Sequence, residues 1–260
     1  MKVVILCGGY GTRIRGVADD VPKPMVEIGG RPMLWHIMKY FASYGHTDFV
    51  LCTGYKSYVI KDYFLNYDHQ FSNISLTIGD GQAPKIDYLH DEAGWNLQII
   101  DTGTETMTGG RIARIKQFVA GEESFFLTYG DGLSDVDLDS LRDFHASHGK
   151  ALTVTGVSPP GRFGEIVSTE GGRVTGFNEK PQVSGGRISG GFFVASQAMF
   201  DHLSGEDDEV FEDQPMDRLV QAEELVMYDH AGFWQCMDTY RDWKLMQGLI
   251  DSDKAAWKRW

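Results

Sequence analysis

The N-terminal run from Lys2 to Leu6 constrains the fold of this chain more than any other stretch. After Lys2 it is wholly β-branched or aliphatic, and no polar residue alternates with an apolar one. A strand of this kind is buried on both faces, as in parallel sheets that helices cover on both sides. The run ends directly at Cys7-Gly8-Gly9, so a glycine loop follows the first predicted strand.

Strand and helix patterns alternate behind this first strand. Apolar residues at helical spacing follow Pro32, and proline is well tolerated in the first turn of a helix. Such alternation predicts an α/β fold with a Rossmann-like, mostly parallel sheet flanked by helices. The further predicted strands are Asp48 to Thr53, Leu97 to Ile100, Ser124 to Tyr129 and Ala151 to Val157, and the predicted helices begin near Pro32, Gly54, Arg111 and Leu138.

Two regions interrupt this alternation. The runs Ile74 to Ile78 and Lys85 to Leu89 predict an antiparallel excursion at the edge of the sheet. From Pro159 the chain turns into glycine-rich hairpins, which predict a smaller β-rich lobe. A strand from Glu224 to His230 and a helix from Tyr240 follow.

One domain is expected over residues 1–260, because 42% hydrophobic residues can fill a core of this size. Residues 1–157 form its first half, residues 158–238 the smaller lobe, and residues 239–260 a C-terminal helix and tail. The net charge of −13 argues against a partner that is a nucleic acid or an anionic membrane. A chain of this charge that binds phosphate must gather its cations locally.

The cysteines and the apolar segments bear on the compartment. Three cysteines without a paired spacing favour a reducing environment over disulfides or a metal site, and the eight histidines show no ligand spacing for zinc. No apolar stretch has the length of a membrane span, and the apolar start is too short for a signal peptide. We therefore expect a soluble, cytoplasmic protein.

The loop after the first strand is suited to phosphate. Gly8, Gly9 and Gly11 allow successive backbone N–H groups to point at a ligand, and Arg13 and Lys23 add positive charge. A P-loop is excluded because Thr12-Arg13 follows Gly11, and a dinucleotide fingerprint fails at Ile14. A plain glycine turn would need neither Arg13 nor a lysine between two prolines.

These residues resemble the signature of the sugar-1-phosphate nucleotidyltransferases. The first part of the resemblance is Gly8-Gly9-x-Gly11-Thr12-Arg13 followed by Pro22-Lys23-Pro24-Met25. Further motifs extend it over essentially the whole chain and narrow it to the glucose-1-phosphate cytidylyltransferases. These motifs include Val26 to Gly30, Leu34 to Met38, Asp101-Thr102-Gly103, Thr108 to Arg111, Tyr129 to Gly132, Pro159 to Gly164 and Gly232 to Gln235.

The resemblance implies a reaction as well as a fold. A phosphate oxygen of glucose 1-phosphate attacks the α-phosphorus of CTP in line, CDP-glucose forms and pyrophosphate leaves. The product feeds deoxysugar formation for a surface polysaccharide or a secondary metabolite. Because the nucleophile is already an anion, the reaction needs alignment and charge neutralisation and no general base.

The resemblance also assigns roles to individual residues. Arg13 and the amides of Gly8 to Gly11 cradle the triphosphate, Lys23 neutralises the α-phosphate, and Lys180 binds the phosphate of the sugar. Arg13, Lys23 and Lys180 are thus the implied catalytic residues. The implied nucleotide contacts also include Leu6, Gly9, Thr12, Thr102, Gly103, Arg111 and Asp131. The implied sugar-phosphate site comprises Tyr129, Glu179, Lys180, Gly190 and Gly191. Asp131 and Asp238 hold Mg²⁺, a hard cation that takes one or two carboxylates together with phosphate oxygens.

Local sequence leaves a structural alternative for several of these residues. Asp131 between glycines is also a common turn residue, and Asp238 is placed to cap the helix that begins near Tyr240. Glu179-Lys180-Pro181 fits the end of a solvated hairpin, and Arg111 fits a surface position at the start of a helix.

Three other residues are also expected to have structural rather than catalytic roles. His36 lies in an apolar helix and is expected to be a hydrogen-bonded core residue. Trp257 and Trp260 fit an exposed amphipathic tail or, as we favour, a contact between subunits.

The resemblance itself implies a homo-oligomer, with a hexamer as one arrangement, in which the loop of Arg111 approaches a neighbouring subunit.

The chain departs from the family pattern at three places. Val21 replaces a common lysine, Cys236 stands where proline is usual, and residues 203–214 are unusually acidic. These departures leave room for a different sugar 1-phosphate or base. A non-catalytic nucleotide sensor is the alternative from another functional class, and an oxidoreductase is disfavoured at Ile14.

Overall fold

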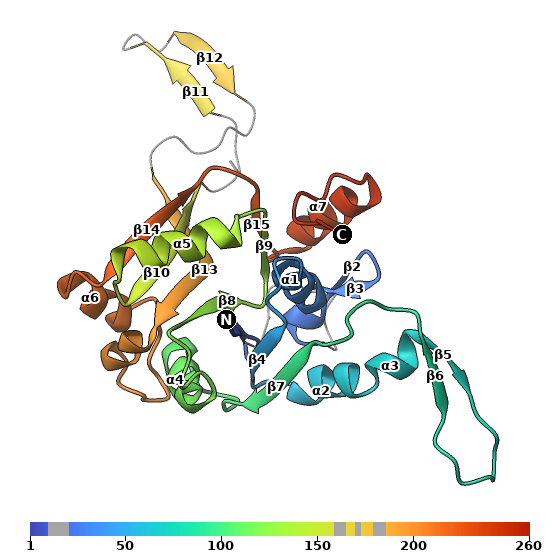
Figure 1. Cartoon of the computed structure of the whole chain (residues 1–260). Helices are drawn as coiled ribbons and strands as arrows, with labels where there is room; N and C mark the ends of the chain where they lie inside the picture. The colour runs from blue at the N-terminus through green and yellow to red at the C-terminus, as the bar shows by residue number, and fades with distance from the viewer. Residues whose placement is uncertain (10–20, 159–164, 170–172, 179–185) are drawn as a thin grey trace.

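A computed structural model describes residues 1–9, 21–158, 165–169, 173–178 and 186–260. Within these residues the centre is a seven-stranded sheet in the order β14-β10-β13-β8-β1-β4-β7 (Figure 1). Its strands are β1 (Val3–Leu6), β4 (Asp48–Thr53), β7 (Asn96–Asp101), β8 (Ser124–Tyr129), β10 (Leu152–Val157), β13 (Ile188–Ser196) and β14 (Leu225–His230). The described α-helices are α1 (Met33–Ala42), α2 (Ser57–Leu65), α3 (Tyr67–Gln70), α4 (Thr108–Arg114), α5 (Leu138–His148), α6 (Gln214–Gln221) and α7 (Tyr240–Asp251).

The sheet is parallel except at one strand. Strand β1 pairs in parallel with β4 and β8, and β10 pairs in parallel with β14. Strand β13 lies between β8 and β10 and runs antiparallel to both. The predicted fold class, a mostly parallel sheet flanked by helices, is therefore confirmed.

The core lies on both faces of β1. Val3 and Ile5 pack into one buried cluster with residues of α1, α5 and α7, whereas Val4 and Leu6 pack into a second cluster with residues of α4 and α6. Leu6 is 8% exposed and the other three are fully buried. This two-sided burial explains why the strand has no polar alternation.

The remaining strands pair in twos outside the central sheet. The hairpin of β5 and β6 extends from the body, beyond α3 (Figure 1). The antiparallel pairing is confirmed, but the strand runs over Ser72–Ser75 rather than Ile74 to Ile78, because residues 76–84 form the long turn of the hairpin. These small sheets are β2 (Glu27–Ile28) with β3 (Arg31–Pro32), β5 (Ser72–Ser75) with β6 (Lys85–Tyr88), β9 (Gly132–Ser134) with β15 (Trp234–Cys236), and β11 (Glu165–Ser168) with β12 (Val174–Asn178).

The segment from residue 158 to residue 238 contributes to two parts of the fold. Strands β11 and β12 form the predicted hairpin away from the central sheet, whereas β13 and β14 are strands of that sheet (Figure 1). The described part of this segment is therefore joined to the first half through the pairing of β13 with β8 and β10.

The C-terminal segment packs against α1. Trp257 is fully buried, and its ring centroid lies 5.4 Å from that of Phe233 and 6.4 Å from that of His36. The prediction of an exposed tail or subunit contact is wrong for Trp257, because this residue fills the apolar core beside α1. Trp260 is half-buried, with its ring 5.8 Å from that of Trp35.

His36 is a core residue, as predicted. It is 5% exposed, and its Nε2 lies 2.8 Å from the carbonyl oxygen of Ile28. Burial lowers the pKa of His36 to about 4. Among the described helices, none combines the length and the apolar character that crossing a membrane requires.

Candidate active site

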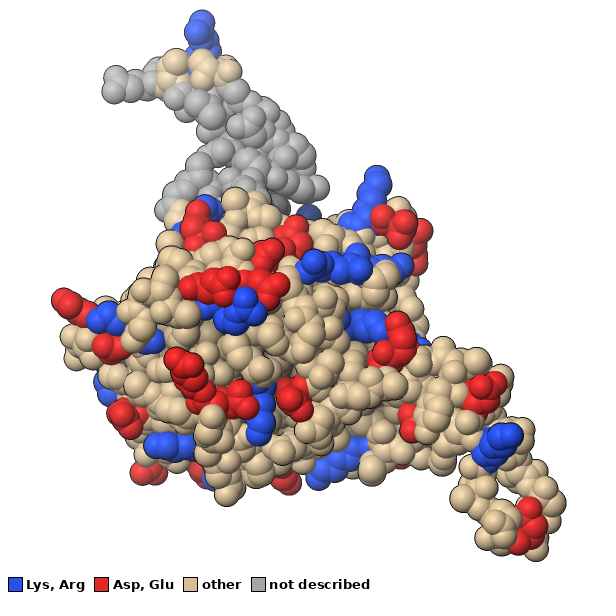
Figure 2. Space-filling view, in the orientation of Figure 1, with Lys and Arg blue, Asp and Glu red and all other residues tan. Residues whose placement is uncertain are grey.

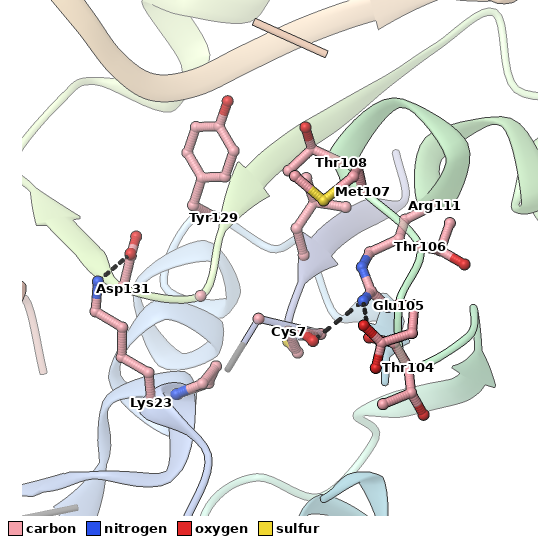
Figure 3. A pocket seen from close by; sticks show the side chains of 15 residues that line it. Cys7, Lys23, Thr104, Glu105, Thr106, Met107, Thr108, Arg111, Tyr129 and Asp131 are labelled. Carbon is pink, nitrogen blue, oxygen red and sulfur yellow. Dashed lines mark hydrogen bonds and ion pairs between the residues drawn. The ribbon is translucent and has the colours of Figure 1, made fainter. Parts of the chain in front are cut away.

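The loops that follow β1, β7 and β8 enclose a pocket at one edge of the sheet, where parallel strands present their carboxyl ends. Its volume is about 350 Å³. Figure 3 shows Lys23 and Asp131 on one side of it, Arg111 and residues 104–108 on the other, and Tyr129 above. The lining residues are Leu6, Cys7, Gly8, Gly9, Lys23, Pro24, Thr104, Glu105, Thr106, Met107, Thr108, Arg111, Tyr129, Gly130 and Asp131.

Arg111 lies at the back of this pocket and ties its loops together. It is 4% exposed, so the alternative of a surface residue is wrong. Its guanidinium donates to the carbonyl oxygens of Gly8, Thr53, Gly103 and Thr104 and to Oγ1 of Thr102, at 2.7 to 3.3 Å. These acceptors lie at or just after the carboxyl ends of β1, β4 and β7, so one side chain joins three strand ends. The implied contact of Arg111 with a nucleotide stays a prediction.

The adjacent glycines Gly8 and Gly9 have different surroundings. A Cβ atom on Gly8 would lie 2.1 Å from Nη1 of Arg111, and one on Gly54 would lie 2.5 Å from the same atom. A Cβ atom on Gly9 would meet no atom of the described residues within 4 Å. Gly8 therefore accommodates the guanidinium, while Gly9 leaves its side of the pocket open.

Thr102 and Gly103 support the pocket from behind. The hydroxyl of Thr102 donates to the carbonyl oxygen of Thr53 at 2.8 Å and accepts a hydrogen bond from Arg111. Gly103 has a φ of +92°, a left-handed conformation that glycine adopts without strain. Neither residue lines the pocket, so in this structure they position Arg111.

Lys23 bridges the two predicted metal ligands. Its Nζ lies 2.5 Å from Oδ2 of Asp131 and 2.6 Å from Oδ1 of Asp238. Burial alone would lower the pKa of Lys23, but the charges and hydrogen bonds of the two carboxylates outweigh burial and raise it. Three segments far apart in the sequence thus converge at one side of the pocket.

Backbone pairing brings the loops of the two aspartates together. Asp131 follows β8, and Asp238 follows β15, whose partner strand is β9. The N–H of Met237 donates to the carbonyl oxygen of Asp131 at 2.8 Å, which joins the two loops directly.

Thr239, and not Asp238, caps α7. The Oγ1 of Thr239 accepts from the N–H of Asp242, while the Asp242 carboxylate accepts from the N–H of Thr239 in return. This reciprocal arrangement is a capping box. The capping alternative for Asp238 is therefore wrong, because the next residue takes that role and leaves the Asp238 side chain to Lys23.

The two carboxylates fit a hard divalent cation. Oxygens of Asp131 and Asp238 converge on one point, since a single ammonium group contacts both. Among the described residues no group of three or more His, Cys, Asp or Glu could hold a metal ion. Mg²⁺ accepts one or two carboxylates and completes its shell with phosphate oxygens and water. The pair therefore suits a cation that arrives together with a triphosphate.

Tyr129, which lines the pocket, packs against the glycines of β13. Gly191 has a φ of +72°, and a Cβ atom there would lie 2.4 Å from the Tyr129 ring. The indole N–H of Trp234 donates to the carbonyl oxygen of Gly190 at 2.7 Å. The pairing of β13 with β8 therefore brings the predicted sugar-site residues Tyr129, Gly190 and Gly191 together.

Sequence reasoning did not single out the side chains of residues 104–107 or Glu212. The carboxylate of Glu212 accepts hydrogen bonds from the hydroxyls of Tyr129 and Thr108, and both donors line the pocket. The acidic run 203–214, seen only as a departure from the family, was the available signal. Its backbone also accepts from the start of α4, where the N–H of Met107 donates to Asp207 and that of Gly109 to Glu209.

Five predicted site residues lie outside the described part of the chain. They are Gly11, Thr12, Arg13, Glu179 and Lys180. Of the other predicted residues, Leu6, Gly8, Gly9, Lys23, Arg111, Tyr129 and Asp131 line the pocket.

The chain is similar to known proteins over nearly all of its length. The nucleotidyl transferase family matches residues 2–239. The glucose-1-phosphate cytidylyltransferases of Salmonella typhi and Salmonella typhimurium are each 45% identical to this chain over 260 residues, which is 100% of both chains. The crystal structure of HddC from Yersinia pseudotuberculosis complexed with GMP-PN has a TM-score of 0.67 at 22% identity, and the match covers 96% of this chain and 99% of HddC.

Proposed function

The chain belongs to the nucleotidyl transferase family, and we propose that it transfers the CMP group of CTP to glucose 1-phosphate. The observation that carries this proposal is the convergence of Lys23, Asp131 and Asp238 beside the loop of Gly8 and Gly9. The relatives that are 45% identical over their whole length support the choice of base and sugar.

The reaction requires one displacement at phosphorus. A phosphate oxygen of glucose 1-phosphate forms a bond to the α-phosphorus of CTP. The bond from that phosphorus to the bridging oxygen breaks on the opposite side, and pyrophosphate leaves with the electron pair. CDP-glucose is the other product, and no proton has to move, so the protein's task is to align two anions and neutralise them.

The described residues suit this task. In this proposal Lys23 neutralises the α-phosphate and Asp131 and Asp238 hold Mg²⁺, which the contacts of Lys23 with both carboxylates support. When bound, the metal supplies positive charge to the phosphate oxygens. The loop at Gly9 leaves room for phosphate beside its backbone.

The charge of the pocket supports the predictions for residues outside the described chain. Lys23 and Arg111 are the basic residues among those described that line it, and Arg111 already donates to five protein oxygens. A triphosphate and a sugar phosphate need more positive charge than Lys23 alone supplies. Arg13 at the triphosphate and Lys180 at the sugar phosphate, with Thr12 and Glu179 beside them, complete the proposed site.

The same proposal includes the organisation of the chain. Residues 1–157 form the nucleotide-binding half. Residues 158–238 form the sugar-binding lobe, and its strand β13 brings Gly190 and Gly191 beside Tyr129. We place the reaction in the cytoplasm. A homo-oligomer is supported by the β5–β6 hairpin, where Leu76 is 61% and Ile78 is 92% exposed.

Pyrophosphate release over a grid of nucleoside triphosphates and sugar 1-phosphates tests the activity. The expected result is the highest kcat/KM with CTP and glucose 1-phosphate, dependence on Mg²⁺, and loss of turnover in Asp131→Asn. Faster turnover of a different nucleoside triphosphate or sugar 1-phosphate would mean that the enzyme uses another base or sugar. The departures from the family pattern at Val21 and Cys236 leave this alternative open. Nucleotide binding without turnover would instead favour a sensor.

A further inference from the structure

Lys23 occupies the point on which the carboxylates of Asp131 and Asp238 converge. We propose that Lys23 is the resident cation of this carboxylate pair in the free enzyme, and that a divalent metal displaces it only when a nucleotide accompanies the metal. The inference rests on the proposed function, which assigns the same pair to Mg²⁺ and the same lysine to the α-phosphate.

The contacts of Lys23 show why the two cations exclude each other. One ammonium group lies within 2.6 Å of an oxygen of each aspartate. A metal ion that binds both oxygens needs that space, and two positive charges so close together repel strongly. The Lys23 side chain is 14% exposed and each carboxylate is 32% exposed, so water screens this repulsion only in part.

Lys23 is built to move its ammonium group without moving its backbone. It lies between Pro22 and Pro24, and the N–H of Met25 donates to the carbonyl oxygen of Pro22 at 2.8 Å in the short 3₁₀ helix Lys23–Met25. The rotatable stem of the side chain lines the pocket. The ammonium can therefore turn from the carboxylates toward a phosphate in the same cavity.

The charge balance makes the exchange depend on the nucleotide. Lys23 brings one positive charge to the two negative charges of the carboxylates. A metal alone would expel the ammonium into a pocket that offers no second anion on that side, because Glu105, the other acidic residue among the described ones that line it, lies across the pocket with Arg111. A triphosphate supplies that anion and further oxygens for the metal, so nucleotide and metal should each raise the affinity for the other by the same factor.

Mn²⁺ is the probe for this coupling, since its free concentration can be followed by electron paramagnetic resonance. Lys23→Met should bind Mn²⁺ without nucleotide more tightly than the wild type does. CTP should tighten Mn²⁺ binding to the wild type by roughly 5- to 150-fold, the usual range for coupled sites. The same addition should have a smaller effect on Lys23→Met. Lys23→Arg retains a cation and should resemble the wild type, and Lys254→Met is the matched control for the loss of an exposed positive charge.

The outcomes separate this inference from the function on which it rests. If Asp131→Asn leaves CTP-dependent Mn²⁺ binding unchanged, the metal assignment itself is wrong. If Asp131→Asn weakens Mn²⁺ binding but folded Lys23→Met binds Mn²⁺ no better than the wild type without nucleotide, the competition is wrong and the metal assignment stands. Circular dichroism confirms that each variant is folded, and Lys23→Arg supplies the comparison with a cation retained.

Discussion

Gly8 and Gly9 are adjacent in the sequence, yet they lack a side chain for different reasons. Gly8 makes room for the guanidinium of Arg111, which joins three loops, whereas no described residue approaches the position of a Cβ atom on Gly9. The same glycine motif therefore combines a packing requirement with a binding requirement. Substitution of the two residues should separate these requirements.

Gly8→Ala should lower stability, and Gly9→Ala should lower activity. The added methyl group on Gly8 would overlap Arg111, and overpacking of this kind costs about 1–3 kcal/mol. The methyl group on Gly9 should change the free energy of unfolding by less than about 0.5 kcal/mol. It should nevertheless raise the KM for CTP, because it enters the pocket. Urea unfolding and initial rates measure both effects, and an unchanged stability of Gly8→Ala would contradict the role of Arg111.

At the scale of single elements, the start of α7 divides two tasks between adjacent residues. Thr239 closes the helix end through its capping box, and Asp238 turns its side chain to Lys23. Local sequence favoured Asp238 as the cap, since both residue types are good caps. The strand pair β9–β15 decides the matter, because it brings Asp238 beside Asp131.

Thr239→Ala should therefore mainly lower stability, whereas Asp238→Asn should mainly lower turnover. Loss of the cap should cost about 1 kcal/mol in the free energy of unfolding and leave most of the activity. Asp238→Asn should abolish turnover with a smaller loss of stability, because its ion pair is partly exposed to solvent. Comparable turnover in the two variants would show that Asp238 has no part in the reaction.

A second element pair makes stability depend on pH. The N–H of Lys150 donates to Nδ1 of His148, whose Nε2 and the Nδ1 of His145 both lie 2.8 Å from Oγ1 of Thr153. This network between α5 and β10 needs neutral rings. Burial, with the neighbouring His148, lowers the pKa of His145 to about 4, and burial and Lys150 lower the pKa of His148.

The stabilisation is expected to disappear as the pH falls. Above about pH 6.5, the ordinary pKa of histidine, these histidines are mostly neutral in both the folded and the unfolded chain. At lower pH they become protonated in the unfolded chain, whereas in the folded chain they stay neutral until the pH approaches their lowered pKa. Through His145 alone, the free energy of unfolding should fall by about 1.5 kcal/mol between pH 6.5 and pH 5. Urea unfolding at both values checks this, and His145→Asn should show a shallower dependence. An equal slope in both proteins would contradict the assignment.

At the scale of the whole molecule, the sequence predicts individual strands and helices better than it predicts which elements pair or pack together. The apolar run of β1 and the alternation behind it were enough for the fold class. The segment after Pro159 was predicted as hairpins of a smaller lobe, and the insertion of β13 between β8 and β10 was not predicted, because local periodicity carries no information about pairing. Trp257 was misplaced for a similar reason, since only the tertiary fold shows that the core beside α1 receives it.

The site was predicted in the same uneven way. The family motifs located Lys23, Asp131 and Asp238, which three distant segments bring together. They did not reveal that the guanidinium of Arg111 donates hydrogen bonds to backbone carbonyl groups, or that the carboxylate of Glu212 accepts a hydrogen bond from Tyr129. Both facts depend on loops that meet only in the folded chain. Acidic and basic side chains are interspersed over the described part of the face in Figure 2, so on this face charge does not single out one region.

The β5–β6 hairpin should join subunits in solution. It extends from the body and exposes Ile78, while Val220 on α6 is a similarly exposed apolar residue at a distant place (Figure 1). Light scattering should give the wild type a mass well above the 29.1 kDa of one chain. Ile78→Asp should lower this mass, whereas Val220→Asp should not. A monomeric wild type, or equal masses for the two variants, would rule out the hairpin as the contact.

The central claim is that this chain moves the α-phosphate of CTP onto glucose 1-phosphate. The most direct test follows CTP that is radiolabelled at the α-phosphate, with glucose 1-phosphate and Mg²⁺ present. The account predicts that the label appears in CDP-glucose with one pyrophosphate released for each labelled product, and that Asp131→Asn forms neither. Label that remains in CTP under these conditions, with the wild-type protein folded, would contradict the account.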